Sequence, residues 1–353
     1  MLDDVSPYGS RRVLVEYDGR TSSAYLYDRS GPISATWLCN HMRAPETVDM
    51  TMLRAGAAPE MPAPYTKHPA GRPPLDPAAL SAVWLEEGDG VAIVEDTELL
   101  AVIPGWSDLA EGMPGYCRDA LGQTPFAWSL DDAIDGLGVR VQQSAQFWQW
   151  RASPGSWHLF QEALLGHLLT RLGPGGGYWD VSGGKHPLVG VTERPPVMGR
   201  PYTVLSTVGM SAQRMPVVEM SGEGAVGRAR IELAIATTMP TTEAARIFLW
   251  LGQLPWREVT WLGSGHIIPW YHVPATFPLA GGNDGLLLVD DPFRLPGPEV
   301  PHLDGFRASN EPVRWLWLIP IDERGRRLAA ERGPDSLLNQ LAAQRRSWVY
   351  QPA

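Results

Sequence analysis

The fold is decided by two stretches in the second half of the chain, Tyr202-Thr-Val-Leu-Ser-Thr-Val-Gly-Met-Ser211 and Thr260-Trp-Leu-Gly-Ser-Gly-His-Ile-Ile-Pro-Trp270. The first is rich in strand formers and small hydroxyl residues, and the second is rich in aromatic residues and glycines. Between them, residues 241–254 have the composition of a helix that ends at Pro255. Neither stretch holds the clustered carboxylates, thiols or paired histidines that bond-making chemistry usually needs. Together they predict a binding module instead of a catalytic centre.

The composition is that of a stable globular protein. The chain has 353 residues, of which 44% are hydrophobic, and this is enough for one large or two ordinary domains. Its formal net charge of -10 argues against a nucleic-acid partner, because surfaces that bind nucleic acid use clustered lysine and arginine. The amino terminus lacks the apolar run of a secretory signal, and no stretch approaches the roughly 18 to 20 apolar residues that cross a bilayer. We therefore expect a cytoplasmic protein without a membrane partner.

Short strands separated by turn residues dominate the first part of the chain. Residues 12–38 predict a three-stranded β-meander, and residues 82–103 predict a second cluster of three strands. Between these groups, residues 55–77 hold seven prolines, which oppose both helix and central strand and predict a long surface excursion. Frequent glycine and proline between residues 106 and 140 predict loops and short helices there.

The second part mixes strands and helices in blocks. The apolar spacing of residues 156–172 predicts an amphipathic helix. Strands are predicted at residues 202–207, 230–237, 286–289 and 313–319, and helices near residues 322–332 and 335–345. Because strands and helices do not alternate regularly, we predict an α+β fold with mixed, mainly antiparallel sheets packed with a few helices. We predict two parts, a domain of residues 1–150 with β-meanders and a domain of residues 151–353.

Two partial motifs resemble catalytic or phosphate sites, and each fails a spacing test. Gly184-Lys185 resembles the end of a phosphate-binding loop, but Trp179 stands where the first glycine is required. Gly263-Ser264-Gly265 resembles a nucleophile elbow, but Leu262 and His266 occupy the positions of its outer glycines. We therefore predict no catalytic residue and no enzyme. The alternative is a hydrolase that uses His266 with Ser264 or with a carboxylate that folding brings near.

Metal and cofactor sites are not predicted either. His266 and His272 are six residues apart, which fits neither a helical pair of ligands nor the usual spacing of metal ligands. Asp290-Asp291 precedes a proline, and adjacent carboxylates on an extended chain point to opposite sides, so this pair is interpreted as a turn. Cys39 and Cys117 lie far apart in the sequence and are predicted to be buried free thiols.

Aromatic residues and prolines surround the second stretch. Rigid rings such as Trp261 and Trp270 supply contact area with little rotamer entropy to lose when a partner docks. The other interpretation is that these rings bury one another between sheet and helix. The residues predicted to contact a protein partner are Thr207, Ser211, Trp256, Trp261, His266, Trp270 and Tyr271.

Six pieces of the second half follow one another in a characteristic order. They are Val204-Leu-Ser-Thr-Val-Gly-Met-Ser211, Ile231-Glu-Leu-Ala-Ile235, Leu254-Pro-Trp256, Gly265-His266-Ile267, residues 277–289 and Leu316-Trp-Leu-Ile-Pro-Ile321, the last followed by two helices. In this order they resemble the suppressor-of-fused (SUFU) domain family, over residues 155–350. Residues 84–91, 101–106 and 114–116 are similar to the amino-terminal extension of bacterial members.

The resemblance implies a non-enzymatic α+β module that binds a protein. Eukaryotic members of the family bind and restrain a transcription factor by gripping an extended peptide. Bacterial members are thought to serve largely as immunity proteins that neutralise toxins of polymorphic toxin systems. Because the chain shows no counterpart of the eukaryotic carboxy-terminal domain, we expect the second role, with a basic toxin domain or an extended peptide as partner. An acidic inhibitor would associate faster with a basic toxin.

Overall fold

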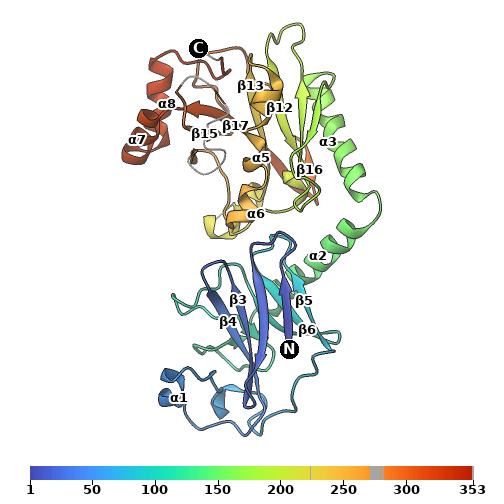
Figure 1. Ribbon diagram of the computed structural model, residues 1–353, viewed down its shortest axis with the longest axis vertical. Helices are drawn as coiled ribbons and strands as arrows, with labels where there is room; N and C mark the ends of the chain where they lie inside the picture. The colour runs from blue at the N-terminus through green and yellow to red at the C-terminus, as the bar shows by residue number, and fades with distance from the viewer. Residues whose placement is uncertain (223, 271–278, 280–281, 352–353) are drawn as a thin grey trace. The chain divides into compact units, whose positions relative to one another are not determined.

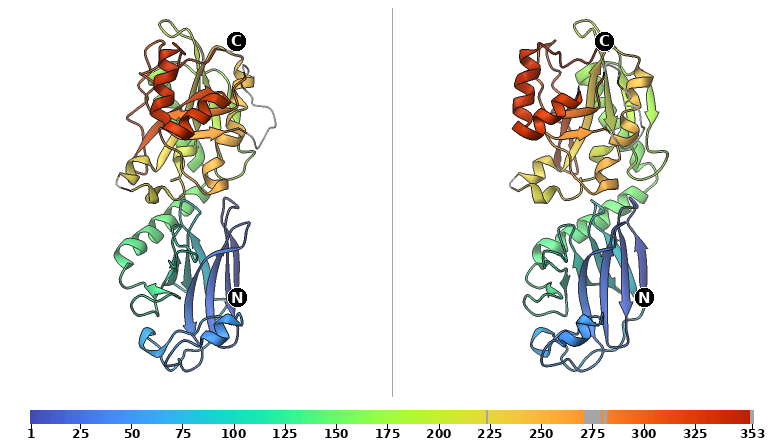
Figure 2. Two further views of the ribbon diagram at one scale, coloured as in Figure 1. Left: turned by 90° about the vertical axis from the view of Figure 1, so that its left-hand side faces the viewer. Right: turned by 60° about the vertical axis from the view of Figure 1, so that its left-hand side comes forward.

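The structure is a computed structural model that describes residues 1–222, 224–270, 279 and 282–351. Its contacts divide the chain into two compact units, Met1–Ser153 and Pro154–Ala353. The predicted α+β class is confirmed, because the described residues combine mainly antiparallel sheets with several helices (Figures 1 and 2). Within these described ranges, no helix is long and apolar enough to cross a membrane.

The first unit holds two sheets that share one core. One has the strand order β1-β2-β3-β4, and the other has the order β5-β6-β7-β8-β9. Their bounds are Leu2–Val5, Arg12–Tyr17, Thr21–Tyr27 and Pro32–Asn40 for β1 to β4, and Leu80–Trp84, Val91–Glu95, Glu98–Ile103, Tyr116–Cys117 and Trp128–Ser129 for β5 to β9. Strand alternation sends Val13, Val15 and Leu26 of one sheet and Ile93 and Ile103 of the other into this core. Both strand groups predicted from the sequence are therefore present.

A long helix in the first unit was not predicted. Helix α2 (Ile134–Ala152) contains Gly136 and Gly138 in its first turns, where glycine weakens the local preference for helix. Its packing against β5 compensates, and the indole nitrogen of Trp148 donates to the carbonyl of Trp84 at 2.8 Å. Two short helices, α1 (Met50–Arg54) and η1 (Ala63–Tyr65), lie in or next to the proline-rich segment.

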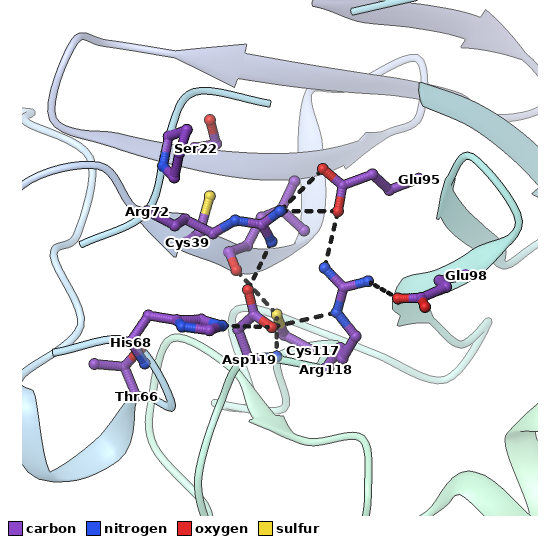
Figure 3. A network of polar contacts seen from close by, with 12 residues as sticks. Ser22, Cys39, Thr66, His68, Arg72, Glu95, Glu98, Cys117, Arg118 and Asp119 are labelled. Carbon is purple, nitrogen blue, oxygen red and sulfur yellow. Dashed lines mark hydrogen bonds and ion pairs between the residues drawn. The ribbon is translucent and has the colours of Figure 1, made fainter. Parts of the chain in front are cut away.

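An ion network ties the proline-rich segment to the second sheet of this unit (Figure 3). Arg72 of that segment donates to Asp119 at 2.8 Å and to both carboxylate oxygens of Glu95 at 2.9 and 3.0 Å. Arg118 donates to Glu95 at 2.9 Å and to Glu98 at 3.0 Å. Asp119 is only 2% exposed. A buried carboxylate needs such partners, so the network holds the proline-rich segment against the second sheet.

Replacing Arg72 by methionine should lower the free energy of unfolding by about 2–3 kcal/mol, because the buried carboxylate of Asp119 would lose the closer of its two guanidinium partners, Arg72 and Arg118. This loss of stability should be smaller than for a fully buried ion pair, because solvent screens the partly exposed Arg72. Urea unfolding followed by circular dichroism measures it. Arg12→Met removes an exposed ion pair with Asp3 and should leave stability almost unchanged. Equal losses in both variants would contradict this role of Arg72.

Acid should remove the contribution of the same network. Burial raises the pKa of Glu95, but hydrogen bonds from Arg118 and Arg72 lower it more, so its pKa in the folded state lies below the usual value. A carboxylate of this kind stabilises the fold above its unfolded pKa, and the stabilisation is lost as pH falls through the folded pKa. Between about pH 5 and pH 3 the wild-type protein should therefore lose stability more steeply than Arg72→Met. Parallel pH profiles would disprove this.

The second unit is built on one large sheet with the strand order β10-β11-β12-β13-β17-β15-β14, and β16 pairs with β17. The bounds are Tyr178–Asp180 (β10), Gly190–Arg194 (β11), Thr203–Val208 (β12), Arg230–Thr237 (β13), Ile267–Pro269 (β14), Gly285–Val289 (β15), Arg307–Ala308 (β16) and Glu311–Ile321 (β17). The central pair β13 and β17 is parallel, whereas the other described pairs of this sheet are antiparallel. All eight residues of β13 are buried, as expected for a central strand covered on both faces.

Helices and short turns cover the two faces of this sheet. Helices α3 (Ser156–Leu172), α7 (Glu323–Arg332) and α8 (Pro334–Ala343) contribute to a core with inward residues of the central strands. Short elements pack around the rest of the sheet: η2 (Met210–Ala212), η3 (Val218–Ser221), η4 (Ala225–Arg228), α4 (Thr241–Ala245), α5 (Phe248–Leu251) and α6 (Leu254–Glu258).

The single helix predicted for residues 241–254 is wrong, since the structure has the three short helices α4, α5 and α6 there. Pro255 does not end a helix, because it lies in the first turn of α6. A proline is tolerated there, where its missing N–H has no partner inside the helix. Pro240 is the N-cap of α4, and this helix start has no side-chain cap hydrogen bond.

Candidate functional site

A buried carboxylate organises the first of the two stretches that the sequence singled out. Glu232 of β13 is fully buried, and its carboxylate accepts four hydrogen bonds from the end of β12 and the turn after it. The hydroxyls of Thr207 and Ser211 donate at 2.6 Å each, and the backbone N–H groups of Gly209 and Ser211 donate at 3.0 Å each. Burial raises the pKa of Glu232, against hydrogen bonds from Ser211 and Thr207 that lower it.

The turn after β12 depends on a glycine. Gly209 has a φ of +118°, which L side chains rarely adopt. A Cβ at this position would also lie 2.4 Å from the carbonyl oxygen of Leu188 and 2.6 Å from the ring of Trp157. Glycine is therefore the residue that lets this backbone approach Glu232 closely enough to donate to it.

The structure places the predicted partner-contacting residues in two different environments. Thr207 and Ser211 are completely buried around Glu232, so their hydroxyls hold the fold together. Trp256 is also completely buried, and its indole nitrogen donates to the carbonyl of Arg214 at 2.9 Å. Trp270 is 5% exposed and meets Trp250 edge-on, with ring centroids 5.0 Å apart. Tyr271 lies outside the described residues.

Among the predicted contact residues that the structure describes, Trp261 and His266 reach the surface. Both are half-buried, and their rings meet edge-on with centroids 4.4 Å apart. Burial lowers the pKa of His266, against a hydrogen bond to the backbone of Trp261 that raises it. A neutral imidazole packed on an indole is suited to a contact role. The two rings form a small aromatic surface next to β14.

A pocket of about 220 Å³ opens beside Trp261. Its lining consists of Arg228, Ile231, Trp261, Leu262, Gly263, Ser264, Asp290, Arg314 and Leu316. These residues come from η4, β13, the loop before β14, the turn after β15 and β17, so the sheet topology brings them together. We call this cavity the Trp261 pocket. The sequence did not predict the contribution of Arg314 or of Arg228.

The hydroxyl of Ser264 is paired with a carboxylate instead of an imidazole. Ser264 donates to Asp290 at 2.8 Å, and Asp290 also accepts from the backbone N–H of Asp291 at 3.0 Å. The hydrogen bond of the His266 ring goes to the backbone of Trp261. Folding therefore brings a carboxylate to Ser264, as the hydrolase alternative requires, but it does not bring His266 to that hydroxyl.

Metal ligands and reactive thiols have little support in the described ranges. No group of three or more histidine, cysteine, aspartate or glutamate residues that could hold a metal ion occurs there. The second histidine of the predicted pair, His272, lies outside the described residues. Cys39 and Cys117 are buried free thiols, as the sequence predicted, and burial raises the pKa of Cys39 to about 12. Neither thiol is available as a nucleophile near neutral pH.

Comparison with known proteins finds one family match, within the second unit. Residues 184–353 match the family model "Suppressor of fused protein (SUFU)". This part of the chain is a SUFU family domain, which confirms the resemblance drawn from the ordered pieces. No curated protein matches the chain. The similarity of the first 140 residues to the amino-terminal extension of bacterial members stays a prediction.

Solved structures resemble the chain at low similarity. A SUFU homolog from Neisseria gonorrhoeae FA 1090 is 15% identical, with a TM-score of 0.39 over 55% of this chain and 94% of that chain. The structure described as the Sufu-Fu complex is 15% identical, with a TM-score of 0.38 over 55% of this chain and 89% of that chain. Drosophila Suppressor of Fused is 15% identical, with a TM-score of 0.33 over 47% of this chain and 41% of that chain. The family assignment therefore rests on the family model.

Replacing Glu232 by leucine should lower the free energy of unfolding by about 3–5 kcal/mol, because two backbone N–H groups and two hydroxyls would be buried without their acceptor. Glu232→Gln should cost less, since its amide oxygen can still face Gly209 and Ser211. Denaturant unfolding of both variants measures the difference. Glu243→Leu, which changes an exposed carboxylate on α4, is the control. A loss for Glu232→Leu no larger than for this control would show that the carboxylate does not organise the turn.

Proposed function

We propose that the chain is a non-enzymatic protein-binding module of the SUFU family, which acts as an immunity or inhibitor protein and binds a toxin domain. The observation that carries the proposal is the SUFU family domain of residues 184–353, the family whose bacterial members are thought to neutralise toxins. The half-exposed ring pair of Trp261 and His266, beside a pocket, supplies the local surface.

The proposed contact surface is smaller than the set of residues predicted from the sequence. Thr207, Ser211 and Trp256 are completely buried and are therefore left out of it. Trp261 and His266 supply ring area that is already fixed by packing, so little rotamer entropy is lost when a partner docks. Aromatic residues held in this way are common among the residues that dominate binding energy.

An extended segment of the partner has a second place to bind. Strand β10 lies at one end of the large sheet, and β14 lies at the other end of the strand order. The backbone N–H of Glu193 donates to the carbonyl of Gly177, and the backbone N–H of Val181 donates to the carbonyl of Val189. These bonds show which residues of β10 turn their backbone groups toward β11 and which turn them away. This alternation directs the backbone N–H and carbonyl groups of Tyr178 and Asp180 away from β11. An exposed edge of this kind supports strand addition by a partner peptide.

The charge of the chain supports a basic partner. A net charge of -10 attracts a cationic toxin domain over distances of about 8–10 Å at physiological salt. Such attraction acts mainly on the rate of association. We therefore expect the association rate constant to fall as salt concentration rises, while the dissociation rate constant changes little.

The alternative function is a hydrolase. The hydrogen bond from Ser264 to Asp290 favours it, because a carboxylate can orient or activate a hydroxyl. His266 would have to turn away from Trp261 to take part. Ser264→Ala tests the hydrolase, since it should abolish hydrolysis of model esters by a hydrolase, whereas a binding module has no such hydrolysis to lose.

Trp261→Ala and His266→Ala should each reduce the recovery of the partner from the source organism, and Trp261→Ala should weaken the purified complex at least about tenfold, as expected for a central aromatic contact. Affinity pull-down followed by titration of the recovered partner measures this. Tyr65→Ala is the matched control, because Tyr65 is an exposed aromatic residue of the first unit. Equal recovery of every partner by wild type, Trp261→Ala and His266→Ala would rule out this surface.

A further inference from the structure

We infer that the Trp261 pocket receives the carboxylate side chain of an aspartate or glutamate from the protein partner, and that Arg314 is the residue that selects it. This inference rests on the proposed function, because it names the chemistry of one anchor residue at the same surface. It adds that this pocket prefers an acidic residue of the partner, which the negative net charge of the chain does not suggest.

The size of the pocket fits one side chain. Sites for small-molecule ligands usually have volumes of about 300–1,000 Å³. At about 220 Å³, the Trp261 pocket is smaller than that range. Its lining includes Trp261 and the apolar residues Ile231, Leu262 and Leu316. These groups can contact the methylene carbons of an acidic side chain while its carboxylate remains at the charged part of the pocket.

Strand geometry explains why Arg314 reaches this pocket. Its neighbours in β17, Val313 and Trp315, are buried in the core, and Arg314 itself is exposed. Alternation along the strand places Arg314 on the same face as Leu316, which also lines the pocket. The parallel register aligns Arg314 with Ile231 of β13, another lining residue.

The guanidinium of Arg314 has no ion pair within the described part of the chain. The negative group of the pocket, Asp290, already accepts hydrogen bonds from Ser264 and from the backbone of Asp291. By contrast, the nearby Arg214 and Arg230 are both paired with Glu311. Arg314 therefore presents a cation with its donors available to a partner at this pocket.

A carboxylate is the group that best matches these donors. A guanidinium presents paired N–H groups in a plane, and this geometry matches the two oxygens of a carboxylate. Arg314 brings a positive charge to this pocket although the chain as a whole is acidic. A basic anchor would meet Arg314 with a like charge, which is unfavourable at a binding surface.

The test is selection of random peptides displayed on phage against the full-length protein. Peptides selected by the wild type should share an aspartate or glutamate at one position. Arg314→Glu should reverse this preference to lysine or arginine at the same position, because the variant inverts the charge that the anchor meets. Binding of a synthetic selected peptide should weaken at least about tenfold in Arg314→Glu, and changing the acidic residue of the peptide to its amide should have a similar effect.

Arg324→Glu is the matched control, since Arg324 is an exposed arginine of α7 outside this pocket and the substitution changes the net charge equally. It should select the same acidic peptides as the wild type. Thermal melting checks that each variant is folded, and Arg314→Gln gives a milder change that should lose the preference without reversing it.

The outcomes separate this inference from the proposed function. Peptides that depend on Trp261 but carry no shared acidic residue would overturn the carboxylate anchor and leave protein binding in place. A shared acidic residue that Arg314→Glu does not affect would overturn the role of Arg314. Failure to enrich any peptide would also overturn the anchor, whereas failure of the proposed function is judged separately, by loss of partner recovery in the pull-down.

Discussion

The large sheet depends on placing a carboxylate in its interior. Glu232 stands in β13, a strand with no exposed residue, and a buried carboxylate is tolerated only when donors surround it. The donors come from the end of β12 and the turn that follows, so this turn must fold back onto β13. The same requirement explains Gly209 and the two small hydroxyl residues on either side of it. One polar side chain therefore fixes the positions of two neighbouring parts of the fold.

Much of the fold could be predicted from the sequence because its strands and long helices follow simple periodicities. The alternation around Val13 and Val15 and the helical spacing of residues 156–172 are local signals, and the structure contains both elements. Helix α2 was not predicted because its glycines disfavour a helix. In the folded chain, packing against the sheet outweighs this local preference. The break of residues 241–254 into short helices likewise depends on tertiary packing, which no local pattern records.

The candidate site was predictable only in part. The aromatic content of residues 260–270 drew attention to Trp261, His266 and Trp270 alike, but a sequence does not show which rings are buried. Thr207 and Ser211 look like surface residues until Glu232 is seen between them, although a lone carboxylate inside an apolar strand is a signal of a buried acceptor. Arg314 lines the same pocket as Ile231 because β17 lies beside β13, a long-range pairing that local composition does not reveal.

The position of β17 has a consequence for synthesis of the chain. This strand is the last long strand to leave the ribosome, yet it lies between β13 and β15, which are made earlier. Until β17 emerges, each of these two strands has an open side in the middle of the future sheet, where another chain could pair with it. The second unit therefore cannot close during most of its translation, and nascent chains at this stage are the form of the protein that most needs protection from aggregation.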